Sequence, residues 1–235
     1  MKKNTLIYLI LIAELFSCKN SNISEIDKVE AKDLNSANNI ISARTFDKME
    51  IYSKYEYKDS VGKSVVIQNG YPKGGVKYID PKGNECGYAV FWTRIINETD
   101  NTLDLNIDFP LHSYEISNVP GKYFKMLVSA ENMTVDKFPL IFYGLTDVES
   151  FLDKNINRPT SLKRTIHAKE SSGIYFLMLI MTLDATGMTR NEISLKGQEL
   201  IYKISRYSTK KPISLIDEME IKCGSINLKN LTLDK

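Results

Sequence analysis

Residue types that commonly carry out catalysis are few and scattered in this sequence. Its 235 residues include two histidines, His112 and His167, and neither has a neighbour whose spacing fixes the geometry of a general base or a metal ligand. No Gly-x-Ser-x-Gly motif marks a nucleophilic serine. These observations predict no catalytic residue, no bound metal and no cofactor.

Two other sequence patterns resemble functional sites but do not meet the requirements of one. Gly62-Lys63-Ser64 matches the end of a phosphate-binding loop, but Tyr57 stands where that loop needs its first glycine. Asp104 and Asp108 lie on the polar face of an expected strand, about 13 Å apart along it. That separation exceeds the 5–9.5 Å of paired catalytic carboxylates. We expect a hairpin turn at the first pattern and a solvated face at the second.

The N-terminal segment has the features of a signal peptide. Lys2 and Lys3 precede the apolar run LIYLILIA (residues 6–13), which is shorter than the roughly 20 residues that span a bilayer. Leu15-Phe16-Ser17-Cys18 follows and resembles a bacterial lipobox, at which the signal peptide is removed and the cysteine thiol is diacylglycerated. The resemblance implies that residues 1–17 are cleaved off and that lipid on Cys18 anchors the mature chain to a membrane. The alternative is an ordinary signal peptide followed by an unrelated cysteine.

Two more cysteines, Cys86 and Cys223, remain in the exported chain. Exported proteins keep disulfides, so a remaining pair predicts a bridge between them. Closing so long a loop would stabilise the fold by about 4–5 kcal/mol in the chain-entropy description. The alternative is two separate buried thiols.

Composition divides the rest of the chain into a tether and a domain. Residues 18–44 are polar, rich in Asn, Ser and Lys, and predict a flexible tether. Residues 45–235 are long enough for one domain with a substantial core. The formal net charge is +2, and no run of Lys and Arg alternates with aromatic residues. We therefore expect no nucleic-acid partner.

Hydrophobic patterning in the domain predicts mostly strands. Residues 102–109 alternate strictly between polar and apolar, and residues 87–96 are apolar, aromatic and β-branched. With the turn-forming residues 97–101 between them, residues 87–109 predict a β-hairpin. Residues 174–183, the most apolar run, predict a central strand buried on both faces. Further expected strands are residues 52–57, 64–69, 122–129, 200–207, 212–223 and 226–233.

One short helix interrupts this pattern. Thr146-Asp147-Val148-Glu149 has the form of a capping box and predicts a helix over about residues 147–155. Residues 70–75 (GYPKGG) predict a loop. The whole pattern predicts a mainly β fold, an antiparallel β-sandwich of immunoglobulin-like style, with a β-barrel as the alternative.

An anchor followed by such a domain resembles small lipoproteins of Bacteroidota. The resemblance implies a binding or envelope-assembly module without enzymatic activity. Its partners would be the membrane, through lipid on Cys18, and envelope proteins or glycans. A cell-envelope hydrolase is the alternative. Lys19 follows the cysteine, in place of the aspartate that retains enterobacterial lipoproteins at the inner membrane, so we expect the outer membrane, in either leaflet.

Overall fold

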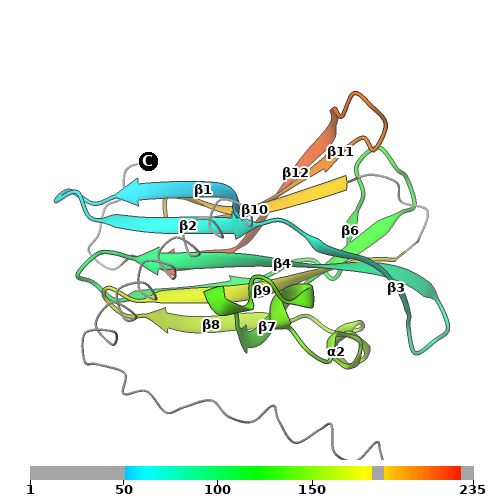
Figure 1. Ribbon diagram of the computed structural model, residues 1–235, viewed down its shortest axis with the longest axis horizontal. Coiled ribbons are helices and arrows are strands. Elements are labelled where there is room, and N and C mark those ends of the chain that lie inside the picture. The colour runs from blue at the N-terminus through cyan, green and yellow to red at the C-terminus, as the bar shows by residue number, and fades with distance from the viewer. Residues whose placement is uncertain (1–50, 182–187, 229–235) are drawn as a thin grey trace, which may run out of the picture. The chain divides into compact units, whose positions relative to one another are not determined.

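The computed structural model describes residues 51–181 and 188–228 (Figure 1). The expected signal peptide, Cys18 and the tether lie outside the described residues. Within the described residues the chain is mainly β, with one α-helix and two 3₁₀ segments. In chain order the elements are β1 (Ile51–Lys58), β2 (Ser64–Gly70), β3 (Lys73–Ile79), β4 (Glu85–Asn97), β5 (Leu103–Asp108), β6 (Tyr114–Glu115), β7 (Tyr123–Asn132), η1 (Val135–Lys137), η2 (Ile141–Gly144), α2 (Val148–Asn155), β8 (Ser161–Ile166), β9 (Ser171–Ile180), β10 (Met188–Lys196), β11 (Glu199–Tyr207) and β12 (Leu215–Asn227).

The strands form two antiparallel sheets packed face to face. The larger sheet has the order β1-β2-β4-β9-β7-β6, with β3 also paired to β4, and the smaller sheet has the order β10-β11-β12-β5-β8. Apolar side chains from both sheets meet in one core, which includes Ile67, Phe176 and Tyr202. The predicted antiparallel β-sandwich is confirmed.

The outer face of the larger sheet is also covered. The segment that contains η1, η2 and α2 covers this outer face (Figure 1), with η2 against β3 and β4, and packs Phe138, Tyr143 and Leu152 into a second cluster with Trp92. Trp92 and Phe138 stack with ring centroids 4.6 Å apart. Strand β9 therefore contributes alternate residues to two apolar clusters, which explains its unbroken apolar sequence. The central strand predicted at residues 174–183 is confirmed for residues 174–180, which belong to β9, and residues 182–183 lie outside the described residues.

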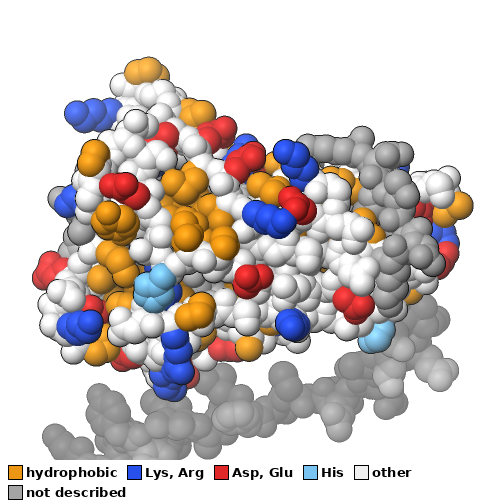
Figure 2. Space-filling view, turned by 180° about the vertical axis from the view of Figure 1, so that it is seen from behind, with side chains coloured by type: hydrophobic (Ala, Val, Ile, Leu, Met, Phe, Trp, Pro, Cys, Tyr) orange, Lys and Arg blue, Asp and Glu red, His pale blue; other side chains and the backbone are white. Residues whose placement is uncertain are grey.

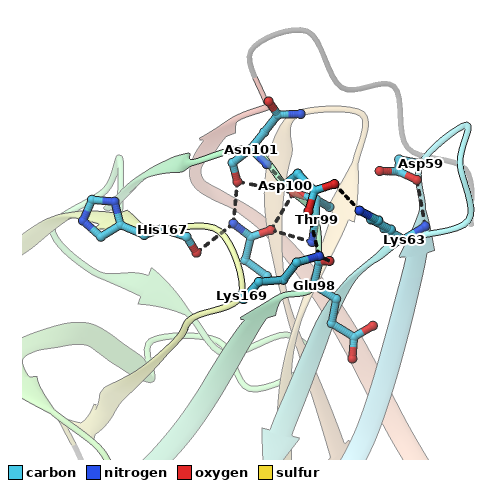
Figure 3. Close-up of polar contacts among 9 residues, drawn as sticks. Asp59, Lys63, Glu98, Thr99, Asp100, Asn101, His167 and Lys169 are labelled. Carbon is cyan, nitrogen blue, oxygen red and sulfur yellow. Dashed lines mark hydrogen bonds and ion pairs between the residues drawn. The ribbon is translucent and has the colours of Figure 1, made fainter.

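The predicted hairpin over residues 87–109 is wrong. Strand β4 belongs to the larger sheet and β5 to the smaller one, so the turn between them crosses from sheet to sheet. Asn97, fully buried, directs this crossing: its amide nitrogen donates to the carbonyls of Asn101 (2.7 Å) and His167 (3.0 Å), and its oxygen accepts from both donors of Thr99 (Figure 3). The side chain thus ties the crossing to the end of β8.

An exposed ionic cluster holds the same crossing from outside. The Asp100 carboxylate lies between Lys63 of the β1–β2 turn and Lys169, whose Nζ is 2.9 Å away (Figure 3). The hydrogen bond from Lys63, then that from Lys169, lowers the pKa of Asp100 to about 2. Because the cluster is exposed to solvent, we interpret it as a structural link between loops and not as a functional site.

Side chains close the seam between β2 and β10, where no backbone ladder joins the two sheets in the described residues. Asn69 donates from Nδ2 to the Ile193 carbonyl (3.0 Å) and accepts at Oδ1 from the Ile193 amide (2.8 Å). The Tyr57 hydroxyl accepts from the Leu195 amide (2.8 Å). These contacts satisfy the edge of β10 as a neighbouring strand would.

Some of the other elements predicted from the sequence are confirmed by the structure, and others are wrong. The hairpin of residues 52–57 and 64–69 is confirmed as β1 and β2, and the helix is confirmed at Val148–Asn155. The capping box is wrong, because Asp147 is the N-cap residue, has φ of +50° and makes no side-chain cap hydrogen bond. The loop expected at residues 70–75 is partly wrong, since β3 begins at Lys73. Of the last expected strand, residues 226–227 end β12, and residues 229–233 lie outside the described part of the chain.

Candidate functional site: an apolar cavity between the sheets

A cavity opens between the two sheets at the end where the β11–β12 hairpin projects (Figure 1). The larger sheet lines it with Phe124, Met178 and Ile180, and the smaller sheet with Ile204 and Met219. The space that it encloses is about 40 Å³, room for a few water molecules and well below the roughly 300–1,000 Å³ of cavities that enclose a small-molecule ligand. Its lining is mostly apolar, as ligand sites commonly are. The apolar lining, and not the size, makes this place the leading candidate site among the described residues.

The cavity forms because the two sheets end at different places. Strand β6 has only two residues, Tyr114–Glu115, whereas β11 and β12 continue together as far as the pair Tyr207 and Leu215. The inner face of the projecting hairpin therefore has little sheet opposite it. Ile116 and Ser117, in the turn after β6, complete the lining on that side.

One ion pair lies in the lining of this cavity. Arg206 and Asp217 are direct cross-strand partners, with Nη2 2.8 Å from Oδ2 and Nε 3.3 Å from Oδ1. Nη2 also donates to the carbonyl of Ser117 (2.8 Å), which fastens the β6–β7 turn to the hairpin. Arg206 is 8% exposed. Its remaining nitrogen, Nη1, has no hydrogen-bond acceptor in the described part of the chain.

The tip of the hairpin extends the apolar surface beyond the cavity. Ile213, Leu215 and Ile216 are 59%, 49% and 44% exposed, and Lys210 and Lys211 precede them in the turn. Figure 2 shows hydrophobic side chains gathered in a hollow beneath the projecting hairpin. Exposed apolar patches of this kind mark sites of interaction more often than scattered single residues do.

The predicted disulfide is absent from the structure. Cys86 and Cys223 are both free and buried. Cys86 belongs to the cluster on the outer face of the larger sheet, and Cys223 to the core between the sheets, so sheet residues separate the two thiols. Burial raises the pKa of both, that of Cys223 to about 12. Both are unreactive core thiols, the alternative that the sequence left open.

The histidines and carboxylates considered in the sequence do not converge. His112 is exposed, and the His167 imidazole points away from the polar contacts of its own carbonyl (Figure 3). Asp104 and Asp108 lie on the exposed face of β5, where Asp104 accepts from the Thr165 hydroxyl (3.1 Å). No group of three or more His, Cys, Asp or Glu side chains in the described residues could hold a metal ion.

A buried lysine that the sequence did not reveal sits near His112. The Nζ of Lys125 donates to the carbonyls of Asn155, Ile156 and Arg158 at 2.8–3.0 Å and lies 3.4 Å from Nδ1 of His112. Burial lowers the pKa of Lys125 to about 8. Because these carbonyls belong to the last residue of α2, to its C-cap residue Ile156 and to the turn that follows, the lysine caps the C-terminal end of that helix.

None of the helices in the described ranges is long and apolar enough to cross a membrane. Comparisons of the chain with protein families, with curated proteins and with solved structures found no match in any of the three.

Proposed function

We propose that the protein is an exported, lipid-anchored binding module that holds an apolar ligand at the mouth of the cavity between its sheets. The observation that carries this proposal is the apolar surface there, which lies beneath a hairpin with an exposed apolar tip. Leaving such surface open forgoes about 25 cal/mol for each Å² that burial would remove from water. A fold with two well-packed clusters elsewhere has reason to keep this surface open only if something occupies it.

The groups around the cavity favour binding over the alternative of a cell-envelope hydrolase. Its polar lining consists of Ser117, Thr189 and the Arg206–Asp217 pair. Hydrolysis needs a nucleophile or an activated water beside a base. Neither hydroxyl has a histidine or a free carboxylate beside it in the lining, because the Asp217 carboxylate is held by Arg206. The residues fit holding and orienting a ligand.

The anchor part of the proposal rests on the sequence around Cys18. We expect Cys18→Ala to abolish labelling by an alkyne-tagged fatty acid in growing cells and to move the protein out of the washed membrane fraction. Lipid chains provide about 0.8 kcal/mol per buried methylene, and two or more of them give stable attachment. Ser17→Ala keeps a small residue before the cysteine and should leave both readouts unchanged. Equal membrane retention of Cys18→Ala and the unaltered protein would remove the anchor from the proposal.

The cavity part is tested by filling the cavity. Met219, half-buried in the lining, is replaced by tryptophan in the mature chain, residues 18–235, with Cys18→Ser so that no lipid is attached. We expect the chain with Met219 to bind the neutral dye Nile red with a blue-shifted emission, and Met219→Trp to weaken that binding at least tenfold, because the indole covers the apolar surface that the dye contacts.

Val61→Trp is the matched control, since Val61 is 74% exposed in the β1–β2 turn. This variant should bind Nile red as the parent does. Urea unfolding of all three chains shows whether each is folded. Equal dye affinity in the folded Met219→Trp chain would mean that the cavity is not the binding site.

A further inference from the structure

Much of strand β12 has no neighbouring strand on the side away from β11. Its backbone pairs with β11 from Leu215 to Ser225, whereas β5 pairs with it only over residues 224–227. Strand β5 ends at Asp108, and the chain then passes to β6 in the larger sheet. Among the described residues, nothing hydrogen-bonds to the backbone of residues 215–222 on this side. Residues 215–222 therefore form an open edge about 27 Å long.

Side chains close two other places where the two sheets meet. The seam between β2 and β10 is closed by Asn69 and Tyr57. On the opposite side of the sandwich, Arg164 of β8 donates to the carbonyls of Ala130 (2.9 Å) and Glu131 (2.8 Å) in β7. Proteins commonly cover or block an unpaired edge, because it can recruit another strand. The open edge of β12 has no such cover in the described part of the chain, so it suits the addition of a strand, the binding mode called β-augmentation.

The inner side of the open edge is apolar. Met219 lines the mouth of the cavity together with Ile116 and Ile180, and Ile221 is 5% exposed in the core. Figure 2 shows hydrophobic side chains in the hollow beneath the hairpin that β12 forms with β11. A strand added to the edge would place every second side chain on this surface. Apolar side chains fit there, on the surface that the proposed function assigns to an apolar ligand, so the inference rests on that function.

The outer side of the open edge is acidic. Glu218 and Glu220 are both exposed on that face. The Glu218 carboxylate accepts from the Ser205 hydroxyl (2.8 Å) and lies 3.4 Å from Nζ of Lys203. Glu220 has no hydrogen bond or ion pair within the described ranges. A lysine or arginine of an added strand, placed opposite Glu220, would therefore meet a carboxylate that has no other partner.

The same charges oppose pairing between two copies of the chain. A two-fold antiparallel pair that uses the whole open edge places Glu218 opposite either Glu220 or Glu218 of the other copy. Like charges directly opposite each other destabilise a sheet, whereas opposite charges stabilise it. We propose that the open edge of β12 binds an extended segment of another protein, in which apolar residues alternate with lysine or arginine.

The test uses the mature chain with Cys18→Ser, as in the Nile red assay, and two peptides as long as the open edge. One peptide alternates valine with lysine, and the other alternates valine with glutamate. At saturating lysine peptide, we expect about half of the amides of residues 215–222 to exchange hydrogen at least tenfold more slowly, because only alternate amides face the edge. Hydrogen exchange followed by mass spectrometry measures this protection. Fluorescence anisotropy should show the lysine peptide binding about tenfold more tightly than the glutamate peptide.

The acidic face is tested by Glu220→Lys. The side chain is exposed, so the fold should persist, and urea unfolding checks this. We expect the lysine peptide to lose its tenfold advantage in this variant, because a positive charge replaces the free carboxylate. Glu98→Lys is the matched control: it changes the net charge equally, at an exposed position of the β4–β5 crossing that lines no part of the cavity. This variant should keep the tenfold advantage.

The possible results separate this inference from the proposed function. Nile red binding that depends on Met219, without protection of residues 215–222 by the lysine peptide, would overturn the added strand and leave the apolar site. Failure of both the dye and the peptide to bind would overturn the proposed function as well. Equal affinity for the two peptides would remove the acidic face from recognition. Protection of residues 215–222 that rises with protein concentration in the absence of peptide would make a second copy the occupant and overturn the basic partner.

Discussion

Asn69→Leu is expected to lower the free energy of unfolding by about 4 kcal/mol. Leucine has the same branched arrangement of side-chain heavy atoms as asparagine but leaves the amide and the carbonyl of Ile193 without partners at the seam between β2 and β10. The Thr93 hydroxyl, which donates to Asn69 Oδ1 at 2.8 Å, also loses its acceptor. Each buried polar group left without a partner costs about 1–3 kcal/mol. Urea unfolding followed by far-UV circular dichroism measures the change.

The control for this prediction is the same substitution on an outer face. Asn106 lies half-exposed on β5, and its amide contributes a 3.4 Å contact to Asp108. Asn106→Leu should change the free energy of unfolding by less than about 0.5 kcal/mol. A loss below about 1 kcal/mol for Asn69→Leu, the lower end of the cost of one unpaired buried group, would show that the edge of β10 is not held through this side chain. The sheets would then be joined at this seam by apolar packing and by the hydrogen bond from the Leu195 amide to the Tyr57 hydroxyl.

The strands that the sequence predicts well are those whose burial repeats regularly along the chain. In β5, Leu103, Leu105 and Ile107 are buried and the residues between them are not, so alternation reports the burial directly. In β9 both faces are covered, and the sequence is apolar throughout. By contrast, β3 is mostly exposed and contains Gly74 and Gly75, so it has the composition of a loop. Strands β8 and β10 also carry too many polar residues to be recognised by their apolar pattern.

The false hairpin over residues 87–109 has a different origin. Both strands and the turn between them are where the sequence predicts. Local turn residues do not determine whether the chain returns to the same sheet or crosses to the opposite one. That choice depends on Asn97 reaching the carbonyls of Ile166 and His167, which are 69 and 70 positions further along the chain. Contacts between residues so far apart along the chain produce no periodic pattern in the sequence.

The candidate site was missed for a related reason. Its lining comes from β7, β9, β10, β11, β12 and the turn after β6, so no short motif contains it. One signal was present: in β11 the inward positions run Leu200, Tyr202, Ile204 and then Arg206, where a charged residue replaces an apolar one. Recognising its partner needs the register that pairs Arg206 with Asp217. The disulfide prediction failed for the same reason, because the sequence does not show which side of the sheet each cysteine faces. Cys86 lies on the outer face of the larger sheet, and Cys223 lies in the core between the sheets.

Gly173→Ala has the other large expected effect, a loss of at least about 4 kcal/mol or failure to fold. A Cβ at this position in β9 would lie 2.0 Å from the carbonyl oxygen of Met133, where the chain leaving β7 crosses over. Relieving that contact displaces backbone, breaking the hydrogen bond from the Met133 amide to the Gly173 carbonyl (3.2 Å) and that from Arg164 Nη1 (2.7 Å). Denaturant unfolding and the soluble yield measure the effect.

Two further variants separate backbone overlap from other costs of adding a methyl group. Gly121→Ala, at a turn glycine with φ of +75° and open space around it, should cost only the roughly 1–2 kcal/mol of left-handed backbone. Met133→Ala combined with Gly173→Ala should not restore stability, because the overlapping atom is a carbonyl oxygen that truncating the side chain leaves in place. Recovery in that double variant would mean that side-chain crowding, and not the close approach of two backbones, excludes every residue except glycine from this position.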